Sequence, residues 1–176
     1  EPCDPLHTKR SGNEKRMKTK THFIGIGGIG MSALARLLIA KNEPVSGSDI
    51  KDSPIIRDLR QAGADIHIGH DAKFLPQGAR VVVSSMIQKN NPELEQATNP
   101  IHRSDLLNEL MQGQKACIIA GTHGKTTTSS LLAHVLKDAE TYPSYAVGGM
   151  IKNYGLNKQI CIKCWFMATI RMPVRT

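Results

Sequence analysis

Two glycine-rich segments constrain the fold of this chain more than any other feature. The first, G-I-G-G-I-G, spans Gly25 to Gly30, and the second, G-T-H-G-K-T-T, spans Gly121 to Thr127. Each follows a short apolar run and precedes a helical pattern. A glycine-rich turn between a strand and a helix directs backbone N–H groups and the positive end of a helix dipole at an anion. We therefore expect two phosphate-binding turns and two phosphorylated ligands.

From His22 onward, short apolar runs alternate with helical patterns. This alternation predicts an α/β fold with a parallel sheet and right-handed crossovers, beginning with a Rossmann-like domain. The expected strands are 22–26, 44–47, 65–68, 80–84, a short one near 101, 116–120 and 144–147, and the expected helices are 29–40, 55–62, 92–97, 104–111 and 125–137.

The first turn satisfies G-x-G-x-x-G with Gly25, Gly27 and Gly30. Asp49 ends the next expected strand, 19 residues beyond Gly30. In dinucleotide-binding folds an acid at this place binds a ribose hydroxyl. The alternative is that the glycines only allow close packing of helix and strand while Asp49 caps the next turn.

The second turn departs from the general P-loop spacing, because Gly121 stands three residues before Gly124 and not five. It fits a more restricted form, G-T-x-G-K-T-T. In such a turn the backbone amides surround phosphates, Lys125 neutralises their charge and Thr126 offers a hydroxyl to magnesium. A chance Gly-Lys-Thr at the start of a helix is the alternative, and the apolar run directly before Gly121 argues against it.

The two turns and their surroundings resemble the Mur ligases, and among them most closely those that add L-alanine. The matching stretches are HFIGIGGIGMSALA at 22–35, VSGSD at 45–49, VVVSSMIQKNNPEL at 81–94, HRSDLLNELM at 102–111, AGTHGKTTTSSLLA at 120–133 and YPSYAVGGMIKNYGLN at 142–157. The resemblance implies an ATP-dependent enzyme of peptidoglycan synthesis. Such an enzyme joins L-alanine to UDP-N-acetylmuramate through an acyl phosphate, with Mg²⁺ as a further cofactor.

The resemblance also implies which residues form the two sites. Gly27 to Gly30 would face the diphosphate and Asp49 the uridine ribose. His70 would approach the uracil, with an exposed loop histidine of no role as the alternative. Lys125 would be catalytic by stabilising charge during phosphoryl transfer, Thr126 would hold Mg²⁺, and His123 would shape the loop. The complete UDP-sugar set is Gly27, Gly28, Ile29, Gly30, Asp49, His70, Ser84 and Ser85, and the ATP set is Gly121, Thr122, His123, Gly124, Lys125, Thr126 and Thr127.

The resemblance divides the chain into four parts. We expect a disordered arm at 1–21, a Rossmann-like UDP-sugar-binding domain at 22–112, the incomplete start of the ATP-binding P-loop-type α/β ATPase domain at 113–157, and an unrelated tail at 158–176. Met17 is a candidate start. The family pattern stops after Asn157, before the acidic cluster that would bind magnesium. This change favours a frameshift or a gene-end artefact, with a genuine short tail as the alternative. We expect the chain to lack ligase activity.

The charge distribution argues against a nucleic-acid partner. The formal net charge is +8, but residues 1–21 hold six basic and three acidic residues and residues 158–176 hold four basic and no acidic ones. The body is therefore nearly neutral, and aromatic residues make up only 4% of the chain, whereas nucleic-acid-binding faces combine basic and aromatic side chains. No apolar run has the length that spans a bilayer. We expect a cytoplasmic protein without a membrane partner.

Two other functions remain open from the sequence. An oxidoreductase would bind NAD through G-I-G-G-I-G, but this leaves G-T-H-G-K-T-T unexplained. A UDP-sugar-binding module without catalysis would use the same fold and would release no ADP.

Overall fold

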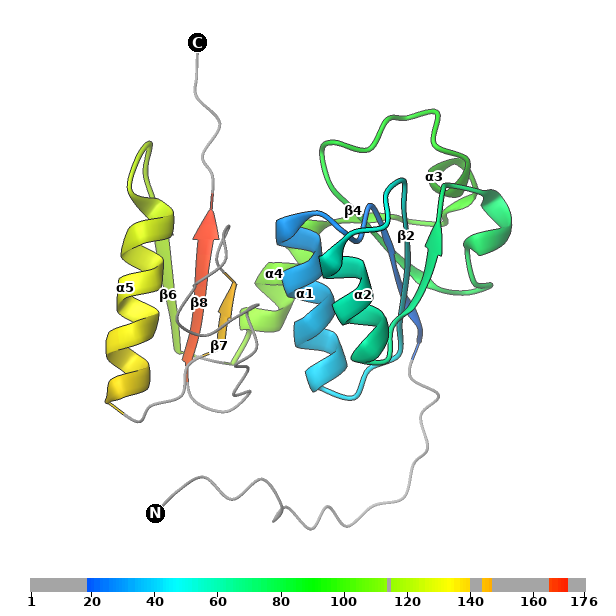
Figure 1. Ribbon diagram of the computed structural model, residues 1–176. Coiled ribbons are helices and arrows are strands. Elements are labelled where there is room, and N and C mark those ends of the chain that lie inside the picture. The colour runs from blue at the N-terminus through cyan, green and yellow to red at the C-terminus, as the bar shows by residue number, and fades with distance from the viewer. Residues whose placement is uncertain (1–18, 114, 140–143, 147–164, 171–176) are drawn as a thin grey trace.

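The computed structural model describes residues 19–113, 115–139, 144–146 and 165–170 (Figure 1). They form two parallel sheets, with strand orders β3-β2-β1-β4-β5 and β6-β8-β7. The first sheet contains β1 (Thr21–Ile24), β2 (Val45–Asp49), β3 (Asp65–Ile68), β4 (Arg80–Val83) and β5 (Ile101–His102). Its helices are α1 (Ile29–Ala40), α2 (Pro54–Gln61), the short 3-10 helix η1 (Ala72–Phe74), α3 (Pro92–Gln96) and α4 (Arg103–Met111).

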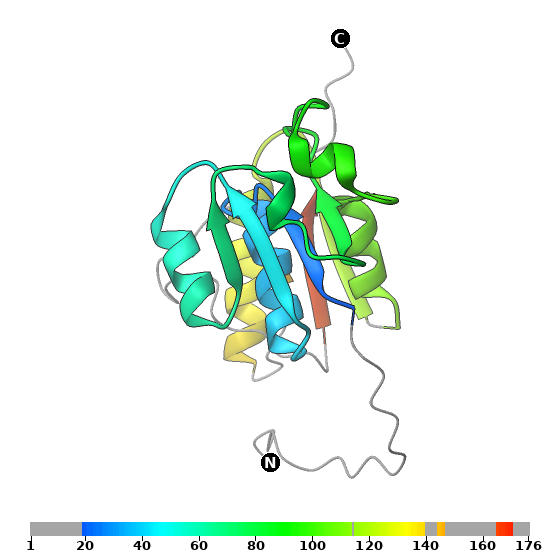
Figure 2. The ribbon, with the colours of Figure 1, turned by 90° about the vertical axis from the view of Figure 1, so that its right-hand side faces the viewer.

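The first sheet has an apolar face covered by α1, α2 and α4, which lie side by side in Figures 1 and 2. Strand residues that point to this face alternate with residues that point away, as the pleat of a strand requires. Phe23, Ile56, Leu59 and Leu106 are all less than 2% exposed in this core. Burial of one such side chain stabilises the fold by about 1.5–3 kcal/mol.

Gly47 allows β1 and β2 to approach each other closely beneath α1. A Cβ at this position would lie 2.7 Å from the carbonyl oxygen of Phe23 and 2.8 Å from Cδ1 of Ile26. Neither group can move freely, because Phe23 is within a strand and Ile26 is fully buried. The absence of a side chain at Gly47 therefore lets β2 pack closely against the residues that lead into and line the first glycine turn.

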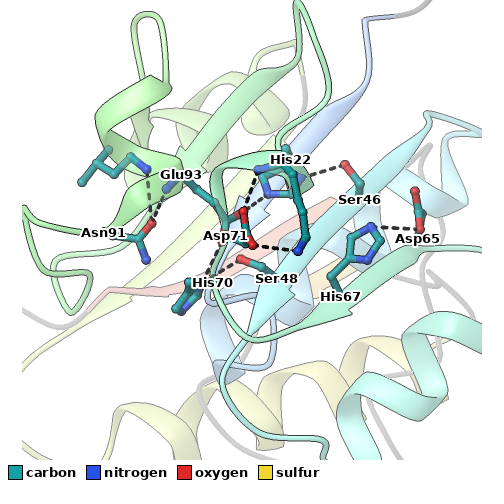
Figure 3. Close-up of polar contacts among 11 residues, drawn as sticks. His22, Ser46, Ser48, Asp65, His67, His70, Asp71, Asn91 and Glu93 are labelled. Carbon is teal, nitrogen blue, oxygen red and sulfur yellow. Dashed lines mark hydrogen bonds and ion pairs between the residues drawn. The ribbon is translucent and has the colours of Figure 1, made fainter.

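The opposite face of the sheet holds a buried polar network (Figure 3). His22 donates from Nε2 to Oε2 of Glu93 at 2.7 Å, and its Nδ1 lies 2.9 Å from the Ser46 hydroxyl. The other carboxylate oxygen of Glu93 lies 2.9 Å from Nδ1 of His70. Both His22 and Glu93 are fully buried. The network fastens α3 to strands β1 and β2.

The sequence around Glu93 explains how it enters the interior. Asn91 caps α3 by accepting the backbone N–H groups of Glu93 and Leu94 at 3.0 and 3.2 Å. Pro92 occupies the first helical position, where its fixed φ favours helix initiation. Burial alone would raise the pKa of Glu93, but hydrogen bonds from His22, Ser48 and His70 outweigh it and lower the pKa. The buried carboxylate is therefore ionised at neutral pH.

The second sheet contains β6 (Lys115–Ala120), β7 (Ser144–Ala146) and β8 (Trp165–Ile170), with α5 (Lys125–Asp138) beside it. Strand β8 lies between the other two, so the segment expected to be an unrelated tail contributes the central strand. The expected arm at 1–21 lies outside the described residues except for its last three positions. No helix in the described ranges is long and apolar enough to cross a bilayer.

The predicted α/β class with a parallel sheet is confirmed. The order β3-β2-β1-β4-β5 matches the first five strands of the Rossmann order 3-2-1-4-5-6. Every expected helix and strand is present with described bounds within two residues of the prediction. Two elements were not expected, the short helix η1 and the six-residue strand β8.

Gly47→Ala tests the close approach of β1 and β2. We expect the free energy of unfolding to fall by about 1–3 kcal/mol, because the added methyl group overpacks a rigid site. Urea denaturation followed by circular dichroism measures this change. Gly28→Ala is the matched control, since its Cβ would meet only an ordinary contact, the Gly25 oxygen at 3.4 Å. Equal loss in both variants would contradict the packing argument.

Glu93→Gln tests the buried carboxylate through the pH dependence of stability. The folded-state pKa of Glu93 lies below its ordinary value of 4.5, so its stabilisation is complete above that pH and is lost as pH falls through the folded-state pKa. We expect the urea concentration at the unfolding midpoint of the unsubstituted chain to decrease when the pH is lowered from about 6 to about 3. The Glu93→Gln variant should be less stable at the higher pH and should show a shallower fall. Glu95→Gln, in the same helix, is the control, and an equally shallow fall there would refute the assignment to Glu93.

Candidate functional site

The carboxyl ends of the five parallel strands bring most of the predicted UDP-sugar residues to one edge of the first sheet. The first glycine turn follows β1, Asp49 ends β2, His70 lies two residues beyond β3, and Ser84 and Ser85 follow β4. In open α/β sheets, ligands bind in the crevice outside the carboxyl ends of the strands. The structure therefore gathers residues that are up to 60 positions apart in the sequence.

The glycine turn presents the uncapped start of a helix. Gly25 has a φ of +78°, which favours glycine, and the Gly28 N–H donates to the Gly25 carbonyl at 3.2 Å. Gly28 is the N-cap of α1 and offers no side chain to the first N–H groups, while the first turn of α1 contains no acidic residue. Both Gly28 and Ile29 are exposed. This end of α1 can accept an anion.

Asp49 fastens the glycine turn to the end of β2. Its Oδ2 accepts the Gly27 N–H at 2.8 Å, and its Oδ1 accepts the Lys51 N–H at 3.2 Å. A Cβ on Gly27 would lie 2.8 Å from the same Oδ2, so a side chain at this position would have to displace the Asp49 carboxylate. Because an ionised carboxylate has about four acceptor sites, Asp49 retains capacity for a ligand hydroxyl. Asp49 can therefore both cap the turn that follows β2 and bind a ribose hydroxyl, the two roles that the sequence left open.

Arg103 is a residue of this edge that the sequence reasoning missed. It begins α4 directly after β5, and a Cβ built on Gly30 would overlap its guanidinium nitrogen Nη1. The guanidinium therefore lies against the start of α1. Within the described residues Arg103 has no acidic partner, so two positive features adjoin each other without a counter-charge. Such a pair favours a phosphate ligand.

The start of α4 holds Arg103 in place through a capping box. The His102 side chain accepts the Ser104 N–H at 3.3 Å, and the Asp105 carboxylate accepts the His102 N–H at 3.3 Å. Nε2 of His102 lies 3.1 Å from the hydroxyl of Ser85, which links β4 to the same helix start. The signal in the sequence is His-Arg-Ser at the junction of a strand and a helix.

His70 is held by the buried network and is not a free loop side chain. Its side chain is 15% exposed, and its Nδ1 lies 2.9 Å from both Glu93 Oε1 and the Ser48 hydroxyl. Neighbouring Asp71 instead caps η1 and pairs with Lys73 at 2.8 Å, which lowers the pKa of Asp71. Figure 3 shows His70 at the margin of this network.

Large apolar side chains are also exposed on segments that end at this edge. Ile68 is the last residue of β3 and is 42% exposed, and Ile50 follows β2 and is 69% exposed. Ile29 and Met86, from the glycine turn and the segment after β4, are 49% and 87% exposed. Exposed apolar side chains next to polar groups are typical of ligand sites.

The second glycine turn joins β6 to α5, at the carboxyl end of β6. Gly124 is the N-cap of α5 with a φ of +73°, and Gly121 has a φ of +153°. The Lys125 ammonium donates to the carbonyl oxygens of Gly121 and Thr122 at 2.5 and 2.8 Å. Thr122, His123, Thr126 and Thr127 are exposed, and Nδ1 of His123 lies 3.2 Å from the Thr122 hydroxyl.

The described residues contain no group of three or more His, Cys, Asp or Glu side chains placed to hold a metal ion. At the second turn the exposed Thr126 is the one predicted metal ligand. Asp138 lies at the other end of α5, about 20 Å from Lys125 at 1.5 Å per residue. It pairs there with His134 at 3.5 Å.

Comparison with known proteins matches both the sequence and the fold. The family described as "Mur ligase family, catalytic domain" matches residues 20–115. The UDP-N-acetylmuramate–L-alanine ligase of Streptomyces griseus is 50% identical over 143 residues, which cover 78% of this chain and 31% of the relative. The ligase of the same name from Paenarthrobacter aurescens is 46% identical over 142 residues, with the same two coverages.

Solved structures agree with this result. The UDP-N-acetylmuramate–alanine ligase of Thermotoga maritima superimposes with a TM-score of 0.76 at 29% identity, covering 86% of this chain and 37% of that one. The UDP-N-acetylmuramate:L-alanyl-γ-D-glutamyl-meso-diaminopimelate ligase from Neisseria meningitides gives a TM-score of 0.75 at 29% identity, with coverages of 86% and 52%.

The matched region lies in the N-terminal part of these relatives, and the chain spans about a third of the length of the two ligases named from Streptomyces and Paenarthrobacter. The family predicted from the glycine turns is confirmed. By its family match, its sequence relatives and its fold, this chain belongs to the Mur ligase family.

Proposed function

We propose that the first sheet binds UDP-N-acetylmuramate at its carboxyl edge. The observation that carries the proposal is the exposed start of α1, which has no side-chain cap and lies against the guanidinium of Arg103, a group without an acidic partner among the described residues. Gly27, Gly28, Ile29 and Gly30 would hold the diphosphate there through backbone N–H groups. Arg103 would add a charge-assisted hydrogen bond.

The other residues of the edge suit the remaining parts of the ligand. Asp49 ends the strand next to the glycine turn and would accept a ribose hydroxyl. His70, which lies two residues beyond the neighbouring strand β3, would meet the base. Ser84 and Ser85 follow β4 on the other side of the glycine turn, and Ser85 is exposed there beside His102. These roles follow the strand order of the sheet.

We propose further that the second turn binds the phosphates of ATP. The residues fit this group: Gly124 lies in the left-handed region, α5 begins directly after it, and Lys125 lies over the turn. Gly121 to Thr127 would surround the phosphates with N–H groups, and Lys125 would be the catalytic cation that neutralises charge. His123 would shape the turn. ATP, when bound, supplies the phosphoryl group that activates a carboxylate.

Magnesium fits the described residues poorly. The Thr126 hydroxyl is exposed at the start of α5, but no described carboxylate lies beside it, and Mg²⁺ in phosphate sites is normally held by carboxylates as well. Of the residues predicted to hold Mg²⁺, the described part of the chain therefore supplies only the Thr126 hydroxyl, and we propose no step through the metal.

The names of the relatives suggest the whole reaction. They are ligases of UDP-N-acetylmuramate and L-alanine, and this chain spans 31% of the length of two of them. We propose that the chain contributes the sugar-nucleotide domain and the phosphate turn to such a ligase. We expect it to bind UDP-N-acetylmuramate without releasing ADP from ATP. The absence of a nucleic-acid partner and a cytoplasmic location stay predictions.

Calorimetric titration of the 176-residue chain separates the proposed ligand from the alternatives. We expect UDP-N-acetylmuramate to bind and NADH not to bind. Binding of NADH alone would favour an oxidoreductase and refute the proposal. ADP release in the presence of ATP, UDP-N-acetylmuramate and L-alanine would instead show that the chain is an active ligase.

Arg103→Ala tests the diphosphate contact. We expect the Kd for UDP-N-acetylmuramate to rise about ten- to a hundredfold, because a charge-assisted hydrogen bond is worth about 1.5–3 kcal/mol. The control is Arg57→Ala, which removes the same charge from α2, where Arg57 lies 4.0 Å from Asp52. Similar effects of both substitutions would mean that only net charge matters, and would remove Arg103 from the site.

Lys125→Ala tests the phosphate turn. We expect ATP affinity, measured by titration with a fluorescent ATP analogue, to fall about tenfold or more, because one direct cation–phosphate contact is lost. Lys137→Ala, at the other end of the same helix, should leave ATP affinity within about twofold, since the positive end of the helix dipole is at Lys125. If the Lys125 variant binds ATP like the unsubstituted chain, the turn is not an ATP site.

A further inference from the structure

We propose that Glu93 fixes the tautomer of His70, so that Nε2 of His70 is a hydrogen-bond acceptor that selects a nucleobase with a ring N–H group, such as uracil, over cytosine. The inference rests on the proposed binding of a UDP-sugar at this edge. It gives Glu93, which lies in the interior, a positioning role in base recognition.

The strand order places His70 where a base would lie. Gly69 donates its N–H to the Asp49 carbonyl at 2.8 Å, so the residue after it lies beside the end of β2. The sheet runs β3-β2-β1, so β3 is on the side of Asp49 that faces away from the glycine turn. If the diphosphate is at the turn and the ribose at Asp49, the base continues toward β3. The exposed side chains of Ile50 and Ile68 supply an apolar surface there.

The buried carboxylate determines which nitrogen of His70 carries a proton. Glu93 is ionised, and an ionised carboxylate only accepts hydrogen bonds. Its Oε2 accepts from His22 at 2.7 Å and its Oε1 from Nδ1 of His70 at 2.9 Å. Nδ1 must therefore bear the proton, and in a neutral imidazole the other nitrogen is then an acceptor.

Other groups around His70 leave this arrangement undisturbed. Ser48 lies 2.9 Å from the same Nδ1 and helps to fix the ring. The Asp71 carboxylate instead accepts hydrogen bonds from the Lys73 ammonium and the Lys73 N–H, so it does not compete for the proton on the ring. Among the described residues Nε2 has no hydrogen-bond partner, and the side chain is partly exposed, so Nε2 is available to a ligand.

The chemistry of the two pyrimidines then decides the preference. Uracil carries a hydrogen on N3 and would donate to Nε2, whereas N3 of cytosine is itself an acceptor. With cytosine, the lone pairs of its N3 and of Nε2 of His70 would face each other, and both atoms would lack a hydrogen bond in a partly buried site. The free-energy cost is much larger than that of an imperfect hydrogen bond. We expect UDP to bind at least about tenfold more tightly than CDP.

The first test needs no substitution. In the ¹⁵N-labelled 176-residue chain, long-range ¹⁵N–¹H spectra report which ring nitrogens of each histidine carry protons. We expect Nδ1 of His70 to be protonated and Nε2 to be unprotonated at neutral pH, with assignment from the signals that disappear in His70→Asn. A proton on Nε2, in either the other tautomer or the charged ring, overturns the inference.

The second test compares UDP and CDP by calorimetry on the same chain. A lower Kd for UDP by tenfold or more supports the inference. Equal affinity overturns it and leaves the proposed function standing. Failure of both nucleotides and of UDP-N-acetylmuramate to bind overturns the proposed function, and the inference with it.

Substitutions distinguish selection from a merely structural role. His70→Asn should bring the ratio of the two Kd values close to one, because an amide can either donate or accept at this place. His67→Asn, in β3 just before His70 and stacked on Phe74, should keep the ratio. A purely structural role of His70 would weaken both nucleotides equally and preserve the ratio, which refutes the proposal.

Glu93→Gln tests the positioning role directly. Its amide group must face one of the two imidazoles with an N–H, so one histidine has to move its proton. We expect the preference for UDP to follow the His70 tautomer seen in the spectra. If the proton moves on His22, the preference is kept; if it moves on His70, the preference is lost. A base preference that does not follow the tautomer overturns the inference. If this variant does not fold by circular dichroism, the spectra and nucleotide titrations of the unsubstituted chain still decide.

Discussion

The ionised carboxylate of Glu93, fully buried on the polar face of the sheet, is the interaction on which the surrounding structure depends. An isolated buried charge costs several kcal/mol, so this group is stable only if its partners are in place. Those partners come from β1, from the end of β2 and from the segment after β3. The single group therefore fixes where α3 docks and where His70 emerges at the edge of the sheet.

The two faces of the first sheet differ in how they stabilise the fold and position the site. The face under α1, α2 and α4 is apolar and close-packed, with Gly47 permitting the approach of neighbouring strands. The other face orients polar groups through hydrogen bonds. Both converge at the carboxyl ends of the strands, where the glycine turn, Asp49 and Arg103 meet. Asp49 and His70 are held at this edge by hydrogen bonds to the glycine turn and to the buried network.

Much of the fold followed from local patterns, and part of the site did not. The glycine turns and the β-branched run at Arg80–Val83 are local signals, and they gave the elements and the family. His22 and Glu93 are 71 positions apart in the sequence. Taken singly, His22 is a polar residue in an apolar strand and Glu93 is a polar residue in a helix, so neither indicates its partner. Arg103 reads as an ordinary residue at a helix start until the fold places it against Gly30. Strand β8 follows a segment with no family pattern, so nothing local indicated that it would pair between β6 and β7.

The position of Lys125 has a consequence for how its turn meets a ligand. Two of its three ammonium N–H groups already donate to the carbonyl oxygens of Gly121 and Thr122. An incoming anion that engages these two groups must compete with the internal acceptors, so part of its affinity measures a difference between two sets of hydrogen bonds. A weak or singly charged anion gains little from this exchange. The exchange therefore favours a ligand of high charge density, such as a polyphosphate, over a simple inorganic anion.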